Sequence, residues 1–366
     1  MRPENEQDLV DVVRGATGPL MVRGGGTRGI GRPGAGAVLE TGGLSGVHLY
    51  EPGALTLVAG AGTPLVEVEA MLAAEGQRLP FEPMDHRGLL GGPGEPTLGG
   101  MVAANASGPR RVQAGACRDS LIGVRFVDGT GALVKNGGRV MKNVTGYDLV
   151  KLMAGSWGTL GVLSAVSFKL LPRPETSTTL LVGGLVAEQA VALMAAALGS
   201  PWEVTGAAHL PDGRTALRIE GFAASVAYRA GALSQFLKQD MTRIEGEASD
   251  DLWRGVRDVA AFHGRPGDVW RLSVKPSDAP ALAARAGGEA LFDWGGGLVW
   301  LLLAEGTDLR ARLGAFAGHA TLIRGSVETR RRIAPFQPEV PAIAALTRGL
   351  RARFDPRGIL NPGLMD

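Results

Sequence analysis

Two glycine-rich segments have the composition of a site that holds a phosphate group by its backbone. Residues 23–27 read Arg-Gly-Gly-Gly-Thr and follow a short apolar run at 20–22. Because glycine lacks a Cβ, it can adopt positive φ and bring its N–H group against a phosphate oxygen. Residues 97–108 are mostly small, and they predict a loop entering a short helix whose positive N-terminal end attracts anions. The alternatives are a glycine-rich surface loop for the first segment and a tight helix-packing face for the second, neither with a ligand.

The surroundings of the first segment do not match the common nucleotide folds. Gly24, Gly26 and Gly29 satisfy the spacing G-x-G-x-x-G, but the Rossmann fingerprint requires a helix to begin there. Residues 31–36 read Gly-Arg-Pro-Gly-Ala-Gly, which cannot form a helix, and a strand-like run follows at 38–41. No lysine follows a glycine anywhere in the sequence, so a P-loop is excluded as well.

Hydrophobic patterning in residues 1–174 predicts a first domain. Val10 and Val13 form the apolar face of an initial helix. A second helix is expected from residue 64 to 75, with Thr63 as its N-cap and Pro64 at its first position. Strands are expected at residues 55–59, 121–127, 132–134 and 162–170, the second and third joined as a hairpin. Two prolines after the last strand mark the end of this domain.

Residues 175–325 alternate strands with helices. Strands are expected at 178–182, 205–210, 215–220, 242–245, 269–274 and 298–303, and helices at 188–198, 223–237, 250–262, 279–286 and 309–316. Split β-α-β units of this kind build an antiparallel sheet with helices on one face. We expect this region to form a cap over the ligand of the first domain.

The last segment, residues 326–366, predicts a helix that packs against the first domain. The apolar residues Val340, Ile343, Leu346, Leu350 and Phe354 fall at helical spacing, and the following Asp-Pro ends the helix.

Composition excludes several classes of protein. A net charge of +2 over 366 residues gives no reason to expect a nucleic acid partner. Five scattered histidines show no metal-ligand spacing, and the single cysteine, Cys117, permits neither an internal disulfide nor an iron–sulfur cluster. The longest apolar runs, 190–198 and 298–304, are far below the roughly 20 residues of a membrane span. Without an apolar signal segment at the N-terminus, the expected compartment is the cytoplasm.

Three further motifs complete a resemblance to a known family. Residues 142–149 read Lys-Asn-Val-Thr-Gly-Tyr-Asp-Leu, residues 155–162 read Gly-Ser-Trp-Gly-Thr-Leu-Gly-Val, and the tail at 354–363 reads Phe-Asp-Pro-Arg-Gly-Ile-Leu-Asn-Pro-Gly. With the two glycine segments, the chain resembles the vanillyl-alcohol oxidase/PCMH superfamily of FAD proteins, and within it the FAD-binding subunits of bacterial glycolate oxidases. The resemblance implies an α+β fold. Its parts are a two-lobed PCMH-type FAD-binding domain at 1–174, a ferredoxin-like cap at 175–325, and a C-terminal segment at 326–366 that returns to the FAD domain.

The resemblance also implies which residues contact FAD. The matching positions are Arg23, Gly24, Gly25, Gly26, Thr27, Thr97, Leu98, Gly99, Gly100, Ala103, Ala104, Gly108, Asp119, Ile122, Gly123, Gly161, Val162 and Asn361. Some relatives attach flavin through a histidine where this chain has Thr27, so noncovalent FAD is expected here. Gly25→Val is expected to abolish FAD binding, because the side chain would take the place of the phosphate and resist positive φ.

The function implied is that of an FAD subunit in a complex that oxidises glycolate to glyoxylate. Hydride passes to flavin, and electrons pass on to an iron–sulfur partner. The histidine motifs of catalytic relatives, His-x-His and Glu-His-Gly, are absent here, so we expect the isolated chain not to be reduced by glycolate. Arg271 and Arg324 are the candidates for a cation that binds the substrate carboxylate. A structural or electron-relay subunit, and a stand-alone FAD oxidoreductase for another hydroxy acid or alcohol, are the alternatives.

The implied partners are a D-type FAD subunit and an iron–sulfur subunit. Without an internal cluster, electrons must leave the chain for another protein or a quinone. The cap surface and residues 330–332, which read Arg-Arg-Arg, are the expected contacts, and attachment to the inner membrane would occur through partners.

Overall fold

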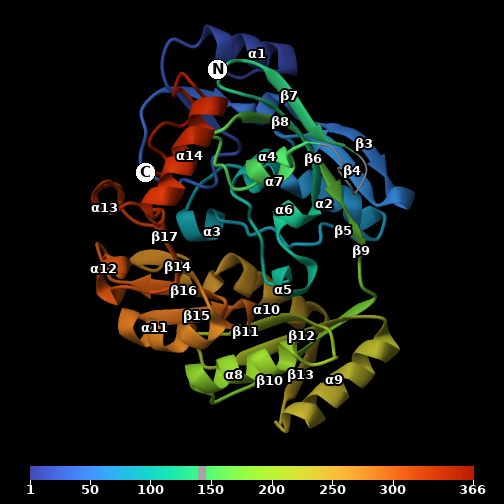
Figure 1. The fold of residues 1–366 in the computed structure, drawn as a ribbon. Coiled ribbons are helices and arrows are strands. Elements are labelled where there is room, and N and C mark those ends of the chain that lie inside the picture. Colours follow the sequence, from blue (N-terminus) through green and yellow to red (C-terminus); the bar gives the residue numbers. More distant parts are fainter. Residues whose placement is uncertain (139–145) are drawn as a thin grey trace.

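Two β-sheets organise the computed structural model, which describes residues 1–138 and 146–366. They lie in two bodies, one above the other, in Figure 1. Within the described residues, the upper sheet has five antiparallel strands in the order β3-β4-β8-β6-β7, and the lower sheet has eight. Of the family motif at 142–149, the first four residues lie outside the described residues.

The upper body begins with α1 and a parallel strand pair. Helix α1 (Glu6–Gly15) is capped by Asn5, whose side chain accepts a hydrogen bond from the N–H of Asp8, and it buries Val10 and Val13 as predicted. The strands β1 (Leu20–Arg23) and β2 (Ala37–Glu40) flank the glycine turn. The five-stranded sheet consists of β3 Val47–Glu51, β4 Thr56–Gly60, β6 Leu121–Val127, β7 Leu133–Gly137 and β8 Val162–Lys169.

Shorter elements complete the upper body. These are η1 Thr41–Gly43, η2 Pro52–Ala54, α2 Leu65–Ala74, β5 Gln77–Arg78, α3 Arg87–Leu90, α4 Leu98–Ala103, α5 Arg111–Ala114, α6 Cys117–Ser120, α7 Leu149–Met153 and β9 Leu171–Pro172. The predicted N-cap of α2 is wrong by one residue. Pro64 is the N-cap, while the hydroxyl of Thr63 donates to the carbonyls of Gly60 and Gly46 instead.

The lower body is the predicted cap, built on one antiparallel sheet. Its strand order is β13-β10-β12-β11-β15-β16-β14-β17. The strands are β10 Thr176–Val182, β11 Val204–His209, β12 Thr215–Gly221, β13 Thr242–Glu245, β14 Asp268–Val274, β15 Glu289–Asp293, β16 Leu298–Leu303 and β17 Gly318–Arg324. The patterning missed β15 and β17, because neither presents the long apolar run that marks β16.

The helices of the cap do not all cover one face. Helices α8 (Ala187–Leu198), α9 (Ala223–Leu237), α11 (Ala279–Ala286) and α12 (Leu309–Leu313) share a core with one side of the sheet. Helix α10 (Gly246–Asp258) packs Trp253 and Val256 with Ile30 and Met84 of the upper body. The expectation of helices on one face is therefore wrong for α10, which lies between the sheet and the upper body. Short 3-10 turns follow at η3 Ala260–Phe262, η4 Pro276–Asp278 and η5 Trp294–Gly296.

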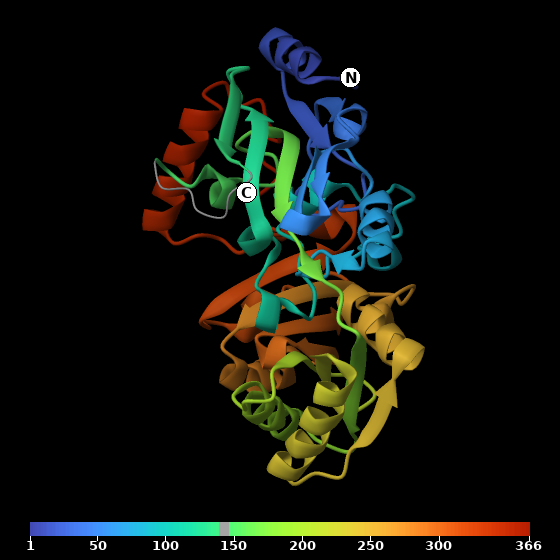
Figure 2. The ribbon, with the colours of Figure 1, turned by 90° about the vertical axis from the view of Figure 1, so that its right-hand side faces the viewer.

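The C-terminal segment returns to the upper body, as expected. Helix α13 (Val327–Arg332) precedes α14 (Pro341–Phe354), which forms the left edge of the upper body in Figure 2. The tail then runs beside β1, where Leu20 and Leu360 form a parallel bridge. The predicted packing of α14 is wrong in detail. Of the five apolar residues at helical spacing, only Phe354 packs inward. It is half-buried against Phe126, with ring centroids 6.1 Å apart.

Five charged side chains join the two bodies. Arg218 of β12 donates to both carboxylate oxygens of Glu82 at 2.8 Å. Glu220, two residues along the same strand, accepts from Arg110 at 2.8 and 2.9 Å and from Arg78 at 2.8 Å. Their side chains are at most 19% exposed. Burial opposes ionisation of Glu220, but Arg218 and Arg110 hold its pKa well below the usual range.

Candidate FAD site at the glycine turn

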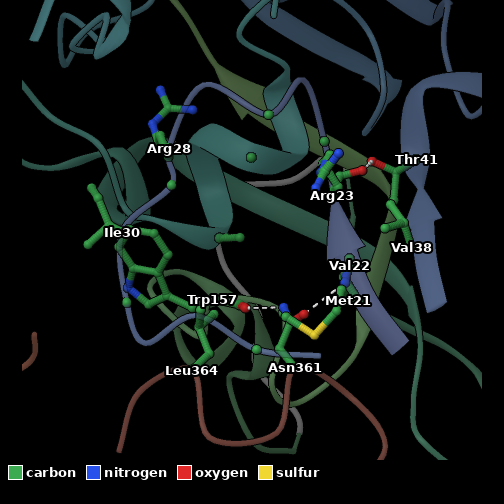
Figure 3. Close-up of a pocket in the computed structure, with 18 of the residues that line it drawn as sticks. Met21, Val22, Arg23, Arg28, Ile30, Val38, Thr41, Trp157, Asn361 and Leu364 are labelled. Atoms are coloured by element: carbon green, nitrogen blue, oxygen red, sulfur yellow. Dashed lines mark hydrogen bonds between the residues drawn. The ribbon is translucent and has the colours of Figure 1, made fainter. Parts of the chain in front are cut away.

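A cavity of about 1030 Å³ opens beside the turn between β1 and β2 (Figure 3). Its volume is at the upper end of the range for sites that hold small molecules. Residues 21–36 supply one wall, α4 and the loop at 156–161 supply others, and the tail closes it with Asn361 and Leu364. Much of the wall is bare backbone, because twelve of the lining residues are glycines: Gly24, Gly25, Gly26, Gly29, Gly31, Gly34, Gly36, Gly94, Gly99, Gly100, Gly158 and Gly161.

The glycine turn is packed backbone against backbone on residues 94–97. A Cβ on Gly25 would lie 1.5 Å from the carbonyl oxygen of Glu95, and one on Gly94 would lie 1.6 Å from the carbonyl oxygen of Gly25. The positive φ of the turn belongs to Gly26, at +73°, and not to Gly25. The expected intolerance of Gly25 therefore has a different cause from the one predicted. A side chain there would collide with the chain itself before it met a ligand.

The second glycine segment forms α4, and its small residues both permit close packing and line the cavity. The hydroxyl of Thr97 caps the helix by accepting from the N–H of Gly100 at 3.3 Å. A Cβ on Gly99 would lie 2.8 Å from that of Ala61, so this glycine permits close packing. Gly99, Gly100 and Ala103 also line the cavity.

Asn361 ties the tail to the cavity wall. Its Oδ1 accepts from the N–H of Val22 at 2.7 Å, and its Nδ2 donates to the carbonyl of Trp157 at 2.8 Å, as Figure 3 shows. The residue adopts φ +45°, a conformation that asparagine tolerates better than most residues. One side chain thus joins β1, the loop at 156–161 and the C-terminal segment.

The cavity brings together ten of the residues expected to contact FAD. They are Arg23, Gly24, Gly25, Gly26, Thr27, Gly99, Gly100, Ala103, Gly161 and Asn361. The other eight, Thr97, Leu98, Ala104, Gly108, Asp119, Ile122, Gly123 and Val162, do not line it. Several of these have structural contacts, since Leu98 and Val162 are in hydrophobic cores and Asp119 accepts from the N–H of Ala116.

Two arginines that face one indole form a second polar feature, between the bodies. The guanidinium carbons of Arg111 and Arg271 lie 4.5 and 5.3 Å from the centre of the Trp294 ring. The indole is held in place because its Nε1 donates to the carbonyl of Gly108 at 3.0 Å. Among the described residues, neither guanidinium has a hydrogen bond or an ion pair. Burial, with Arg111 nearby, lowers the pKa of Arg271 to about 10.

Other ionisable groups lie around this pair. Burial raises the pKa of Asp293 to about 7, and burial together with Arg28 lowers the pKa of His86 to about 3. The sequence analysis named Arg271 as a candidate, which stays a prediction, and it named neither Arg111 nor Asp293. The sequence feature that could have pointed to Arg111 is the pair of adjacent arginines, Arg110 and Arg111, just after the second glycine segment.

The remaining sequence candidates have partners within the chain. Arg324 donates to the carbonyls of Gly267, Leu89, Phe262 and Arg265, so its guanidinium joins loops of the structure. Cys117 is fully buried, and burial raises the pKa of its thiol. In the run at 330–332, the first and third arginines donate to the carbonyls of residues 29 and 306. The part of the chain that the structure describes contains no group of three metal-ligating side chains.

Comparison with known proteins identifies the class first. The sequence profile of a family described as "FAD binding domain" matches residues 1–137. The solved structure of alkyldihydroxyacetonephosphate synthase superposes with a TM-score of 0.71, covering 99% of this chain and 76% of that one at 15% identity, so the two share a fold. The chain is thus an FAD-binding-domain protein with the α+β fold expected from its sequence.

The particular family follows from a curated relative. The chain is 36% identical over 350 residues to "Glycolate oxidase subunit GlcE" of Escherichia coli (strain K12), which covers 95% of this chain and 92% of the relative. It is 44% identical over 85 residues to "Glycolate oxidase subunit GlcD" of Bacillus subtilis (strain 168), over 23% of this chain and 18% of that protein. The chain belongs to the family of the glycolate oxidase subunit GlcE, within the FAD-linked oxidoreductases. In the described residues, no helix is both long and apolar enough to cross a membrane.

Proposed function

We propose that this chain is the FAD-binding subunit of a complex that oxidises glycolate, or a similar 2-hydroxy acid, to the 2-oxo acid. The near full-length similarity to GlcE carries this proposal. Residues 1–174 bind FAD, residues 175–325 form the cap, and residues 326–366 close the cofactor cavity. The complex works in the cytoplasm, with contact to the inner membrane through partners.

The residues at the cavity fit a diphosphate held by backbone N–H groups. The turn at 24–27 presents three successive glycines, and the tail anchored by Asn361 closes the opposite side. Bound FAD supplies the acceptor for the hydride that leaves C2 of the hydroxy acid. Thr27 offers no nitrogen for a covalent link, so the cofactor is noncovalent. Acid precipitation of the purified protein should release all the flavin into the supernatant, and yellow colour kept in the pellet would disprove noncovalent binding.

The substrate carboxylate binds between Arg111 and Arg271. Two guanidinium groups that share one indole, with no ion pair to either among the described residues, repel each other, and a carboxylate between them relieves that repulsion. Both keep their charge at neutral pH, since even the lowered pKa of Arg271 is about 10. Arg271→Gln should weaken glycolate oxidation by the complex at least about tenfold, mainly through KM. Arg254→Gln, at an exposed position on α10, is the matched control.

Anaerobic titration with glycolate separates the roles within the complex. The isolated chain can bind the carboxylate through Arg111 and Arg271, but it lacks the histidine motifs of its catalytic relatives. We therefore expect its flavin to stay oxidised until a partner subunit completes the site. Co-purified with the D-type FAD subunit and the iron–sulfur subunit, the assembly should bleach and pass electrons to a dye. Bleaching of the isolated chain would place the oxidation step on this chain. Full dye-linked activity of the other two subunits without it would refute the proposed function.

A further inference from the structure

Helix α14 leaves its apolar stripe uncovered. Val340, at the N-cap, and Ile343, Leu346 and Leu350 within the helix are 64, 48, 66 and 40% exposed, and no residue of the helix is buried. The spacing of three, three and four places them on one side, over a length of about 15 Å. Such a narrow seam is the pattern of helices that pack against another protein helix or groove.

The side of α14 that touches its own chain is a different one. The half-buried residues are Ala344, Thr347, Arg351 and Phe354, a set with a single large apolar side chain. Three of them directly follow a member of the stripe in the sequence, so the stripe lies about 100° around the helix axis. The chain therefore contains a well-patterned apolar seam that its own fold does not use, and isolated helices of this length are marginal without such packing.

The surroundings of the seam favour a partner with carboxylates. The helix contains three arginines and no acidic residue, but Arg351 is already paired with Asp366, and Glu339 just before the helix accepts from the hydroxyl of Thr347. The charge free to meet a partner at the seam is therefore that of Arg353.

Arg353 is exposed at the C-terminal end of the seam. It lies two turns after Leu346 on the same side of the helix, and it has no ion pair among the described residues. Small residues beside the seam, Ala342 and Gly349, let another backbone approach closely.

The chain segments on either side of α14 line the cofactor cavity. Residues on both sides of α14 along the chain, Arg330 before it and Asn361 and Leu364 after it, line that cavity. A protein bound to α14 would thus be connected by one short segment to the wall of the FAD site.

We propose that the exposed face of α14, formed by Val340, Ile343, Leu346 and Leu350 with Arg353 at its end, is the docking surface for another subunit of the proposed complex. The partner presents an apolar groove with Asp or Glu at its rim. This inference rests on the proposed function, because it requires a heteromeric assembly. The cap surface and residues 330–332, which the sequence suggested as the contact, stay a separate prediction.

Co-purification from cells that express all three subunits tests the surface. Leu346→Glu should weaken assembly at least about tenfold, because it places a charge in the centre of the seam and would face carboxylates. Val66→Glu is the matched control, since Val66 of α2 is 57% exposed and lies away from α14, and it should assemble as the wild type does. Flavin content and circular dichroism of each variant should match the wild type, because no buried contact is removed.

A charge reversal provides the second arm. Arg353→Glu should weaken assembly several-fold and reduce its dependence on salt, whereas Arg348→Glu, on the opposite side of the helix from the seam, should not. Normal assembly of Leu346→Glu would overturn the surface alone, while a wild-type chain that never co-purifies would overturn the proposed function and the surface with it. Leu346→Glu could instead leave assembly intact and abolish only binding to anionic phospholipid vesicles, or only a homodimer. Either result would also overturn the surface as a subunit contact.

Discussion

Removal of one carboxylate from the charged network between the two bodies should cost several kilocalories per mole. In Glu220→Gln the shape of the side chain is kept, but Arg78 and Arg110 lose the negative charge that they share. Glu220 is 6% exposed, so water cannot replace the lost interaction. Removal of one partner from a buried ion pair costs about 3–5 kcal/mol. Since Gln still accepts one hydrogen bond, we expect about 3 kcal/mol, a large part of the stability of an ordinary protein.

The matched control is Glu289→Gln on the surface of the cap. Glu289 pairs with Arg265, but the two side chains are 45 and 43% exposed, so the loss should stay below about 1 kcal/mol. Urea unfolding followed by circular dichroism and by flavin fluorescence measures both variants. Because the network joins the bodies, Glu220→Gln should also separate the two signals into two transitions.

The pH dependence gives a second check on the same variant. Its neighbouring arginines keep the pKa of Glu220 below the usual range, so its contribution is present above the ordinary carboxyl pKa and is lost as the pH falls. The difference between wild type and Glu220→Gln should therefore shrink in acid. Equal losses for the buried and the exposed variants would refute the reasoning.

Three further predictions concern the FAD site and the domain interface. Gly25→Ala should abolish flavin retention through its collision with a backbone carbonyl, whereas Gly29→Ala, with open space around its Cβ, should retain flavin; equal retention would contradict this. Asn361→Ala should lose about 1–3 kcal/mol of stability and release flavin more easily, as thermal unfolding with and without added FAD would measure. The raised pKa of Asp293 costs stability as the pH rises from about 4 to 7, so Asp293→Asn should become progressively more stable than the wild type over that range, by up to about 4 kcal/mol. A constant difference across that range would show that this carboxyl is not protonated in the folded chain.

Many of the elements could be predicted from the sequence because their signals are local. The apolar face of α1, the strand at 162–169 and the alternation of strands and helices in the cap follow from side-chain periodicity over a few residues. The two glycine segments likewise supplied eight residues that line the cavity, because a wall made of bare backbone requires a run of residues with small or no side chains. Strand β15 was not predicted, because it is short and because its pairing with β11 and β16 depends on the tertiary structure.

The contacts between distant segments needed the tertiary structure. Arg111 and Arg271 are 160 residues apart in the chain, and no periodicity relates them, yet packing of the cap on the FAD domain brings both to Trp294. The same holds for the ion network, in which Glu82 and Arg218 meet across the two bodies. Which side of an amphipathic helix is covered is also a tertiary property. The periodicity of α14 defines an apolar seam, but only the folded chain decides that the seam faces outward, because the helix packs on the core of the five-stranded sheet through Phe354 instead.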